Sequence, residues 1–348
     1  MHTRREFLKM GSVAAIGAGL LGVVVRPAKA APETAESLGI APSNTAAANR
    51  AALITACNNT SKHIVFGNTP GDYQFQNNTP IVIQNFSGTI EFVTGTTTCW
   101  QFTNNTVKAI NFNGGTGLHL WKVRTKYTTL PPSRVNAQEC VHISNATDPL
   151  AQGLIIQGSA AAGLLFGNCI RPVAQDVVVV DTRADGVHFA NCQAASATTI
   201  NVTRPGDDGV AFVNYGSTNF GGTASGITVT DGDTRGITVV GQQDVEISDF
   251  TVNRTYSSGI YVACEGGSYP SMPQPKNVTV RDGEVIGAGL LLKGGVSGPN
   301  PDSIFYHDCH SAIAFTNITS RCPVRDHVRY GGIGTTSTLT NIQQFAAC

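Results

Sequence analysis

A short segment recurs through the second half of the chain: a glycine, an apolar residue, a variable residue and another apolar residue. The six copies are Gly163-Leu-Leu-Phe166, Gly186-Val-His-Phe189, Gly209-Val-Ala-Phe212, Gly236-Ile-Thr-Val239, Gly259-Ile-Tyr-Val262 and Gly289-Leu-Leu-Leu292. Their glycines, the frame glycines, are 23, 23, 27, 23 and 30 residues apart (186 − 163 = 23 for the first pair). Self-similarity at this period predicts a solenoid, in which each repeat packs only on its neighbours.

A second apolar run accompanies each copy, and its composition predicts β-structure. These runs are Leu154–Ile156, Val177–Val179, Ile200–Val202, Ile227–Val229, Val245–Ile247 and Val278–Val280. They are short, rich in Val and Ile, and bounded by turn-forming residues, which favours strands over helices. Short strands stacked on the same strands of the next repeat make an all-β fold, the parallel β-helix. The variable positions should then face outward; they include His188, Ala211, Thr238 and Tyr261.

Both ends of the solenoid should differ from its regular coils, which we place at about residues 150–295. Residues 44–58 predict a helix with Asn44 as its N-cap. Its apolar stripe would consist of Ala48, Ala52, Leu53 and Ala56. A short amphipathic helix is the expected cap for the N-terminal end of a solenoid. Residues 299–348 should form a final coil and a capping tail.

The composition fits one domain over residues 31–348, because a solenoid grows by adding coils. Charged residues make up only 13%, which suits stacked strands joined by tight turns. The 23 basic and 23 acidic residues balance, so nothing favours nucleic acid or a membrane surface as a partner. We expect a monomer.

The first 30 residues have the features of a targeting segment. Paired arginines in Thr3-Arg-Arg-Glu-Phe-Leu-Lys9 precede an apolar run that ends near Val25. An Ala-x-Ala motif follows at Ala28-Lys-Ala30. This pattern resembles a bacterial twin-arginine signal cleaved after Ala30, although an uncleaved membrane anchor is the alternative. The resemblance implies a folded protein exported to the periplasm, the cell envelope or the medium, without stable membrane association after cleavage.

Nine cysteines are an odd number, so at least one has no partner within the chain. Cys169 and Cys192 each lie six residues after a frame glycine and should stack on adjacent coils. They could form a disulfide or a buried ladder of thiols. No Cys-x-x-Cys pair indicates a zinc site.

Two adjacent repeats carry three aspartates at related positions. Asp185 and Asp208 each directly precede a frame glycine, and Asp207 lies beside them. Equal positions on adjacent coils are about 4.8 Å apart, and carboxylates that close are costly unless they bind or react with something. Inverting glycoside hydrolysis needs one protonated acid and one carboxylate that activates water. Asp185 and Asp208 could share that water, while Asp207 supplies the proton.

The motifs around these aspartates resemble those of polygalacturonase-type glycoside hydrolases, which are right-handed parallel β-helices. Asp185-Gly186 matches the end of the family's Asn-Thr-Asp-Gly motif, and Gly206-Asp207-Asp208 matches its Gly-Asp-Asp motif. The match in register covers about residues 154–295. The resemblance implies an inverting hydrolase with Asp207 as acid and Asp185 with Asp208 as the water-activating pair.

The chain also departs from the family pattern. Arg235 stands where the family has a histidine, and Tyr261 and Ala263 replace the Arg and Lys of an Arg-Ile-Lys motif. Because those cations bind a uronate carboxylate in the family, plain polygalacturonate is an unsuitable substrate. We expect a neutral sugar stacked on Tyr261. Further tyrosines could assist this stacking: Tyr256, Tyr269 and Tyr215.

Several alternatives stay open from the sequence. The Asp-Gly sequences could be turns. Arg235 could bind the substrate or be a counter-ion of the carboxylates, and His188 could bind the substrate or be a surface residue. A polysaccharide lyase would use the aspartates to bind Ca²⁺ and Arg235 as its base. A carbohydrate-binding solenoid without catalysis would keep only the tyrosine face. The hydrolase interpretation requires no metal or cofactor.

Overall fold

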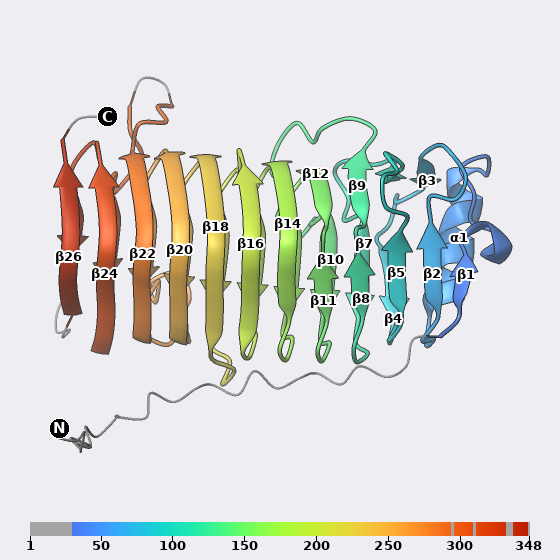
Figure 1. The fold of residues 1–348 in the computed structure, drawn as a ribbon, viewed down its shortest axis with the longest axis horizontal. Helices are drawn as coiled ribbons and strands as arrows, with labels where there is room; N and C mark the ends of the chain where they lie inside the picture. Colours follow the sequence, from blue (N-terminus) through green and yellow to red (C-terminus); the bar gives the residue numbers. More distant parts are fainter. Residues whose placement is uncertain (1–29, 294–295, 309–310, 332–336, 347–348) are drawn as a thin grey trace, which may run out of the picture.

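The protein is a parallel β-helix, as the repeats predict (Figure 1). The structure, a computed structural model, describes residues 30–293, 296–308, 311–331 and 337–346. The predicted twin-arginine segment, residues 1–30, lies outside the described residues apart from Ala30. No helix in the described ranges is long and apolar enough to cross a membrane.

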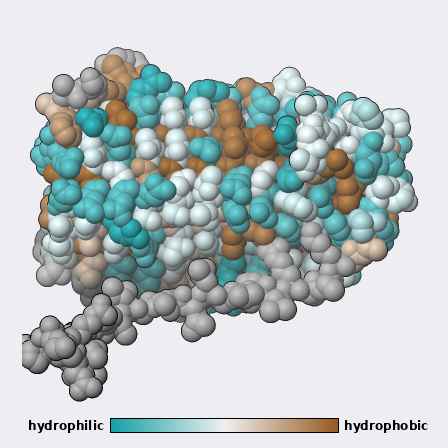
Figure 2. Space-filling model, in the orientation of Figure 1, coloured by the Kyte–Doolittle hydropathy of each residue, from teal (hydrophilic) through white to brown (hydrophobic). Residues whose placement is uncertain are grey.

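Two parallel sheets run the length of the solenoid, and from residue 155 onward their strands alternate along the chain. The larger sheet contains β1 (Pro32–Thr34), β2 (His63–Phe66), β3 (Tyr73–Phe75), β5 (Thr89–Phe92), β6 (Trp100–Phe102), β8 (His119–Trp121), β9 (Arg124–Tyr127), β11 (Leu150–Gln152), β12 (Ile155–Ser159), β14 (Val173–Thr182), β16 (Ala195–Thr203), β18 (Gly222–Gly232), β20 (Gln243–Thr255), β22 (Lys276–Ala288), β24 (Ser311–Arg321) and β26 (Ser337–Phe345). The smaller sheet contains β4 (Ile81–Gln84), β7 (Ile110–Asn113), β10 (Val141–Ser144), β13 (Leu164–Gly167), β15 (Val187–Ala190), β17 (Val210–Val213), β19 (Ile237–Val240), β21 (Ile260–Ala263), β23 (Ile304–His307) and β25 (Val328–Tyr330). Figure 2 shows the face of Figure 1, where hydrophobic side chains form a band among hydrophilic ones.

Each frame glycine before β13, β15, β17, β19 and β21 lies where the backbone turns tightly against the larger sheet. A Cβ atom on Gly209 would lie 2.5 Å from a methyl carbon of Val229 and 2.6 Å from the carbonyl oxygen of Gly236. No side chain fits there, so the glycine sets the entry of its strand. This close approach explains why the glycine recurs in these five successive coils.

The sixth predicted copy of the repeat is wrong. Leu290 and Leu292, which follow Gly289, are 42% and 54% exposed and lie outside the strands. The next coil begins instead at Ser303, because Ile304 of β23 pairs with Ile260 of β21. The runs Val245–Ile247 and Val278–Val280 also lie elsewhere in the coil than expected, since Ile227 pairs with Phe250. Residues 299–348 contribute β23 to β26 rather than one coil and a tail.

The interior is filled by stacked apolar side chains. Phe166, Phe189 and Phe212 are fully buried, and their rings stack at centroid distances of 5.1 and 4.9 Å. Cys169 and Cys192 are buried beside them as free thiols, which matches the thiol ladder and not the disulfide. Identical residue types in register therefore line the core as ladders.

A helix covers the N-terminal end of the solenoid, as predicted (Figure 1). This helix, α1 (Ala46–Cys57), is capped by Thr45, whose hydroxyl accepts a hydrogen bond from the amide of Ala48. Asn44 instead donates to the carbonyl of Gly39. The buried residues of α1 are Asn49, Leu53, Ala56 and Cys57, so Ala48 does not belong to the apolar stripe. A short 3-10 helix, η1 (Glu36–Leu38), precedes α1.

The variable positions of β17, β19 and β21 are not exposed, although their side chains point out of the solenoid interior. Ala211, Thr238 and Tyr261 are at most 6% exposed. A second apolar cluster forms outside the coils, where Met272 packs on the smaller sheet. The loop between β21 and β22 therefore covers this face and forms one wall over the sheet.

Candidate active site

The residues that precede the frame glycines form a ladder along the smaller sheet. The amide of Gly163 donates to the carbonyl of Asp185, and the amide of Gly186 donates to that of Asp208. The amide of Gly209 donates in the same way to the carbonyl of Arg235. Asp185, Asp208 and Arg235 thus occupy successive rungs, which gives Asp185 and Asp208 the common slot that the repeat predicted.

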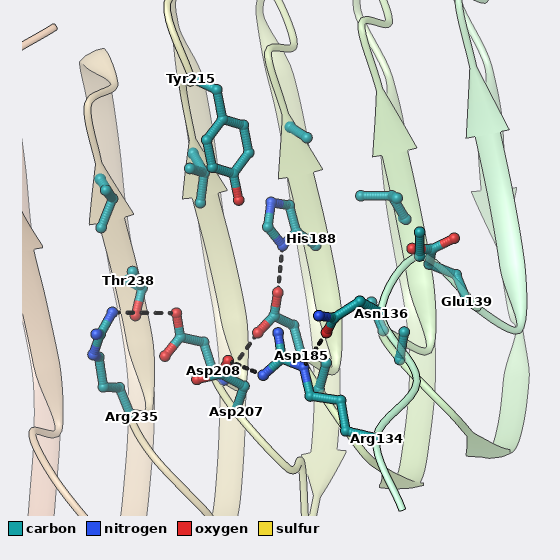
Figure 3. A pocket seen from close by; sticks show the side chains of 18 of the residues that line it. Arg134, Asn136, Glu139, Asp185, His188, Asp207, Asp208, Tyr215, Arg235 and Thr238 are labelled. Atoms are coloured by element: carbon teal, nitrogen blue, oxygen red, sulfur yellow. Dashed lines mark hydrogen bonds and ion pairs between the residues drawn. The ribbon is translucent and has the colours of Figure 1, made fainter. Parts of the chain in front are cut away.

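The three predicted aspartates meet at this ladder (Figure 3). One oxygen from each carboxylate lies within 4.8 Å of an oxygen from each of the others. The amide of Asp208 also donates to Asp185 Oδ1 at 3.0 Å. Asp185 and Asp208 are only 7% and 6% exposed, so neither charge is well solvated. Assembling them requires compensating positive charge.

Three basic side chains supply that charge, one for each carboxylate (Figure 3). Arg134 Nη1 donates to Asp207 Oδ2 at 2.6 Å, and Arg235 Nη1 lies 3.7 Å from Asp208 Oδ2. His188 contacts Asp185 Oδ2 through Nδ1. This favours the counter-ion interpretation of Arg235 and places His188 in the site rather than on the open surface. A Ca²⁺ ion would have to displace these cations, so the charge balance does not favour a metal at the triplet.

The environments of Asp185 and Asp208 push the pKa values of these two carboxyl groups apart. Burial raises the pKa of Asp208 to about 7, against the opposing influence of Arg235. Burial also acts to raise the pKa of Asp185, but the charge and hydrogen bond of His188 hold it below its usual value. Burial disfavours the charged form of His188, yet Asp185 raises the pKa of the imidazole overall. At neutral pH an ionised carboxylate thus lies beside one that is readily protonated.

A cleft of about 400 Å³ opens over the triplet. The three aspartates, Arg134, His188 and Arg235 all line it. Tyr215 stacks on His188 with ring centroids 6.2 Å apart, and Tyr269 meets Tyr215 edge-on at 4.9 Å. These two tyrosines form an aromatic wall beside the carboxylates. The cleft volume is in the usual range for ligand sites.

The structure does not support a sugar platform at Tyr261 or Tyr256. The ring of Tyr261 is only 6% exposed and is covered by the Arg235 guanidinium, 3.8 Å from the ring centroid. Its hydroxyl also contacts His307 Nε2 at 2.8 Å. Tyr256 lies against Lys293 and does not line the cleft. Tyr261 instead positions Arg235, because a cation over an aromatic face is held electrostatically.

Sequence reasoning missed the charged groups that reach the triplet and its cations from loops. Arg134 reaches Asp207 from the loop before β10, across 73 residues of sequence. Glu265, which lies 3.1 Å from Arg235 Nη2, comes from the loop after β21. Neither residue belongs to the repeat, so the period of the chain carries no signal for them. The prolines before Arg134 identify its segment only as a loop.

A family model described as a right handed beta helix region matches residues 139–300. The catalytic domain of a GH87 alpha-1,3-glucanase is similar in structure, with a TM-score of 0.61 and 13% identity over 87% of this chain and 57% of that chain. The polygalacturonase of Erwinia carotovora ssp. carotovora gives 0.59 and 12%, over 88% of this chain and 93% of the other. A pectate lyase gives 0.50 and 12%, over 84% and 72%. No curated protein matches.

The fold is the right-handed parallel β-helix. The neighbours share this fold with the chain. They include glycoside hydrolases and a lyase, so this fold is shared by enzymes of both classes. At these identities the likeness is one of fold, and the chemistry has to be argued from the site.

Proposed function

We propose that the protein is a glycoside hydrolase that cleaves a polysaccharide with the Asp185–Asp207–Asp208 triplet. The supporting observation is the environment of the triplet: three carboxylates lie in one cleft, each with its own cation, and the pKa of Asp208 is raised while that of Asp185 is lowered. Such separation is how enzymes obtain an acid and a base from the same residue type. The hydrolase neighbours agree with this class of substrate.

The family resemblance implies that Asp207 is the proton donor. The contacts of Asp207 and the environment of Asp208 support Asp208 in that role instead. Asp207 is engaged by Arg134 in an ion pair at 2.6 Å, so its carboxylate already has a fixed partner. Asp208, with a pKa of about 7, is better suited to donate a proton to the leaving oxygen. Asp185 is then the carboxylate that activates water, and His188 orients the Asp185 side chain. In this proposal Asp207 and Arg134 shape the cleft and bind the glycan.

The proposed substrate is a glycan other than plain polygalacturonate. Arg235 is already engaged by Asp208, Glu265 and the ring of Tyr261, so it has little capacity left for a uronate carboxylate. Tyr215 and Tyr269 can contact the apolar face of a neutral sugar ring. The twin-arginine pattern supports export of the protein, which would bring it to polysaccharides outside the cytoplasm.

A lyase remains the second candidate because a pectate lyase shares the fold. Arg235 would have to act as its base, yet Asp208 and the other acidic neighbours raise the pKa of Arg235 further above its usual range, despite burial. A guanidinium in that state accepts no proton. The paired cations also take the place that Ca²⁺ would need at the aspartates.

A polysaccharide panel tests this function. Purified protein should release reducing ends from at least one neutral glucan, xylan, mannan or galactan, without ultraviolet absorbance from unsaturated products and without sensitivity to a chelator. Asp185→Asn should abolish the release. Chelator-sensitive unsaturated products would establish the lyase. Binding to a glycan with no turnover in the wild type would establish a non-catalytic β-helix.

A further inference from the structure

Glu139 lies on the same ladder as the catalytic triplet but two rungs from Asp185. Val141 pairs with Leu164, and Leu164 pairs with Val187, so Glu139, Ala162 and Asp185 occupy successive rungs. Adjacent rungs are about 4.8 Å apart, which separates Glu139 from Asp185 by about 10 Å along the solenoid. The alanine between them leaves an interval with no polar side chain on this ladder.

This interval forms the floor of one part of the cleft. Ala161, Ala162 and Leu165 line the cleft together with Glu139 and Asp185. The floor is therefore small and apolar, with a carboxylate at each end. A sugar ring has the same distribution of polarity, because its face is apolar and its rim carries hydroxyls. Hydroxyl groups that reach the rim can donate to either carboxylate.

Glu139 is held in position by a buried polar group of its own. Lys108 Nζ lies 2.8 Å from Glu139 Oε2 and 2.7 Å from His142 Nδ1. The side chains of Glu139 and Lys108 are only 8% and 13% exposed. Burial and the neighbouring Lys108 lower the pKa of His142 to about 4, so its neutral ring accepts from the ammonium. Glu139 is thus a fixed acceptor at the far end of the floor.

We propose that this floor is a subsite for one neutral sugar unit and that Glu139 determines its specificity by accepting hydrogen bonds from the hydroxyls of that unit. The subsite lies on the β10 side of the triplet, so the sugar bound there adjoins the bond that is cleaved. An anionic sugar with its carboxylate at this end would be repelled by Glu139. The inference rests on the proposed hydrolase function and extends it to the substrate class.

Two variants test the subsite with whichever neutral glycan of the panel is hydrolysed. Glu139→Gln should raise KM by roughly 10-fold or more, the scale for a lost hydrogen bond to a charged group, and leave kcat within about twofold. Leu165→Phe, which leaves the charges intact, should raise KM by filling the floor. Glu284→Gln is the control, because Glu284 is also held in an ion pair, with Arg321 at 2.6 Å, but lies on the larger sheet.

A binding measurement separates this inference from the hydrolase proposal. Calorimetry in the Asp185→Asn background should show weaker binding of neutral oligosaccharides from the panel when Glu139→Gln is added. An unchanged KM in both variants, or a loss of kcat at unchanged KM in Glu139→Gln, would overturn the subsite while the hydrolase stands. If wild-type protein hydrolyses no glycan of the panel, the hydrolase proposal fails first, and the subsite fails with it.

Discussion

Asp208→Asn gives the sharpest view of how the carboxylates divide their roles. The amide keeps the shape of the side chain but cannot donate the carboxylic proton. We therefore expect kcat on a natural glycan to fall by about 10²–10⁴-fold, the scale of general acid catalysis, or about 3–5 kcal/mol in the barrier. An aryl glycoside with an activated leaving group needs little protonation. On that substrate the variant should retain most of its activity.

The comparison variant is Asp207→Asn, which removes the partner of Arg134 and leaves Asp208 in place. It should lower activity on both substrates to a similar extent, because it affects binding rather than protonation. Selective rescue of Asp207→Asn by the activated substrate would show that the family assignment of the acid is correct and that ours is wrong.

The pH profile gives an independent check on the same assignment. A proton donor acts only in its protonated form, so wild-type kcat/KM should fall as pH rises through about 7, the pKa of Asp208. Asp185 is already ionised well below that pH, since His188 lowers its pKa. An alkaline limb that stays at the same pH in Asp208→Asn would refute the role of this residue.

Three further predictions concern stability and stereochemistry. Because the pKa of Asp208 is raised in the folded state, ionisation of this residue weakens the fold as pH rises from about 4 to 7. Asp208→Asn should therefore raise Tm by a few degrees at pH 8 and change it little at pH 4. An unchanged Tm at pH 8 would contradict the buried charge. Gly209→Ala should cost about 1–3 kcal/mol by overpacking against Val229, whereas Gly267→Ala, which meets nothing within 4 Å, should be neutral in chemical denaturation. The family resemblance implies hydrolysis with inversion of the anomeric configuration. The carboxylate oxygens of the triplet lie within 4.8 Å of one another, closer than the roughly 6.5–9.5 Å between the carboxyl groups of most inverting enzymes. Proton NMR of the first product should show the inverted anomer, and a retained anomer would exclude that mechanism.

The regular part of the fold was predictable because one physical constraint repeats in the five coils that begin with β13, β15, β17, β19 and β21. Gly209 and its equivalents are required by contact with the next coil, so they mark the period directly. The same period placed Asp185 and Asp208 in one slot. The period gave a wrong prediction at Gly289, where a turn repeats the sequence pattern without the strand pairing that defines a coil.

The remainder of the site depends on loops, which the period does not describe. Arg134 and Glu265 reach the cleft through tertiary packing between segments far apart in sequence. The error at Tyr261 has the same origin: alternation correctly points its side chain out of the coil, but the loop after β21 and Arg235 cover that face. Outward orientation in a strand is thus not equivalent to exposure when long loops fold back on the sheet.

Cleavage in water enriched in ¹⁸O tests the central claim most directly. Mass spectrometry of the products should show one ¹⁸O atom at each newly formed reducing end, because hydrolysis adds the atoms of one water across the broken bond. Asp185→Asn and Asp208→Asn should form this labelled product far more slowly. Products that lack the label and are lighter than hydrolysis products by one water would show elimination and would contradict the hydrolase.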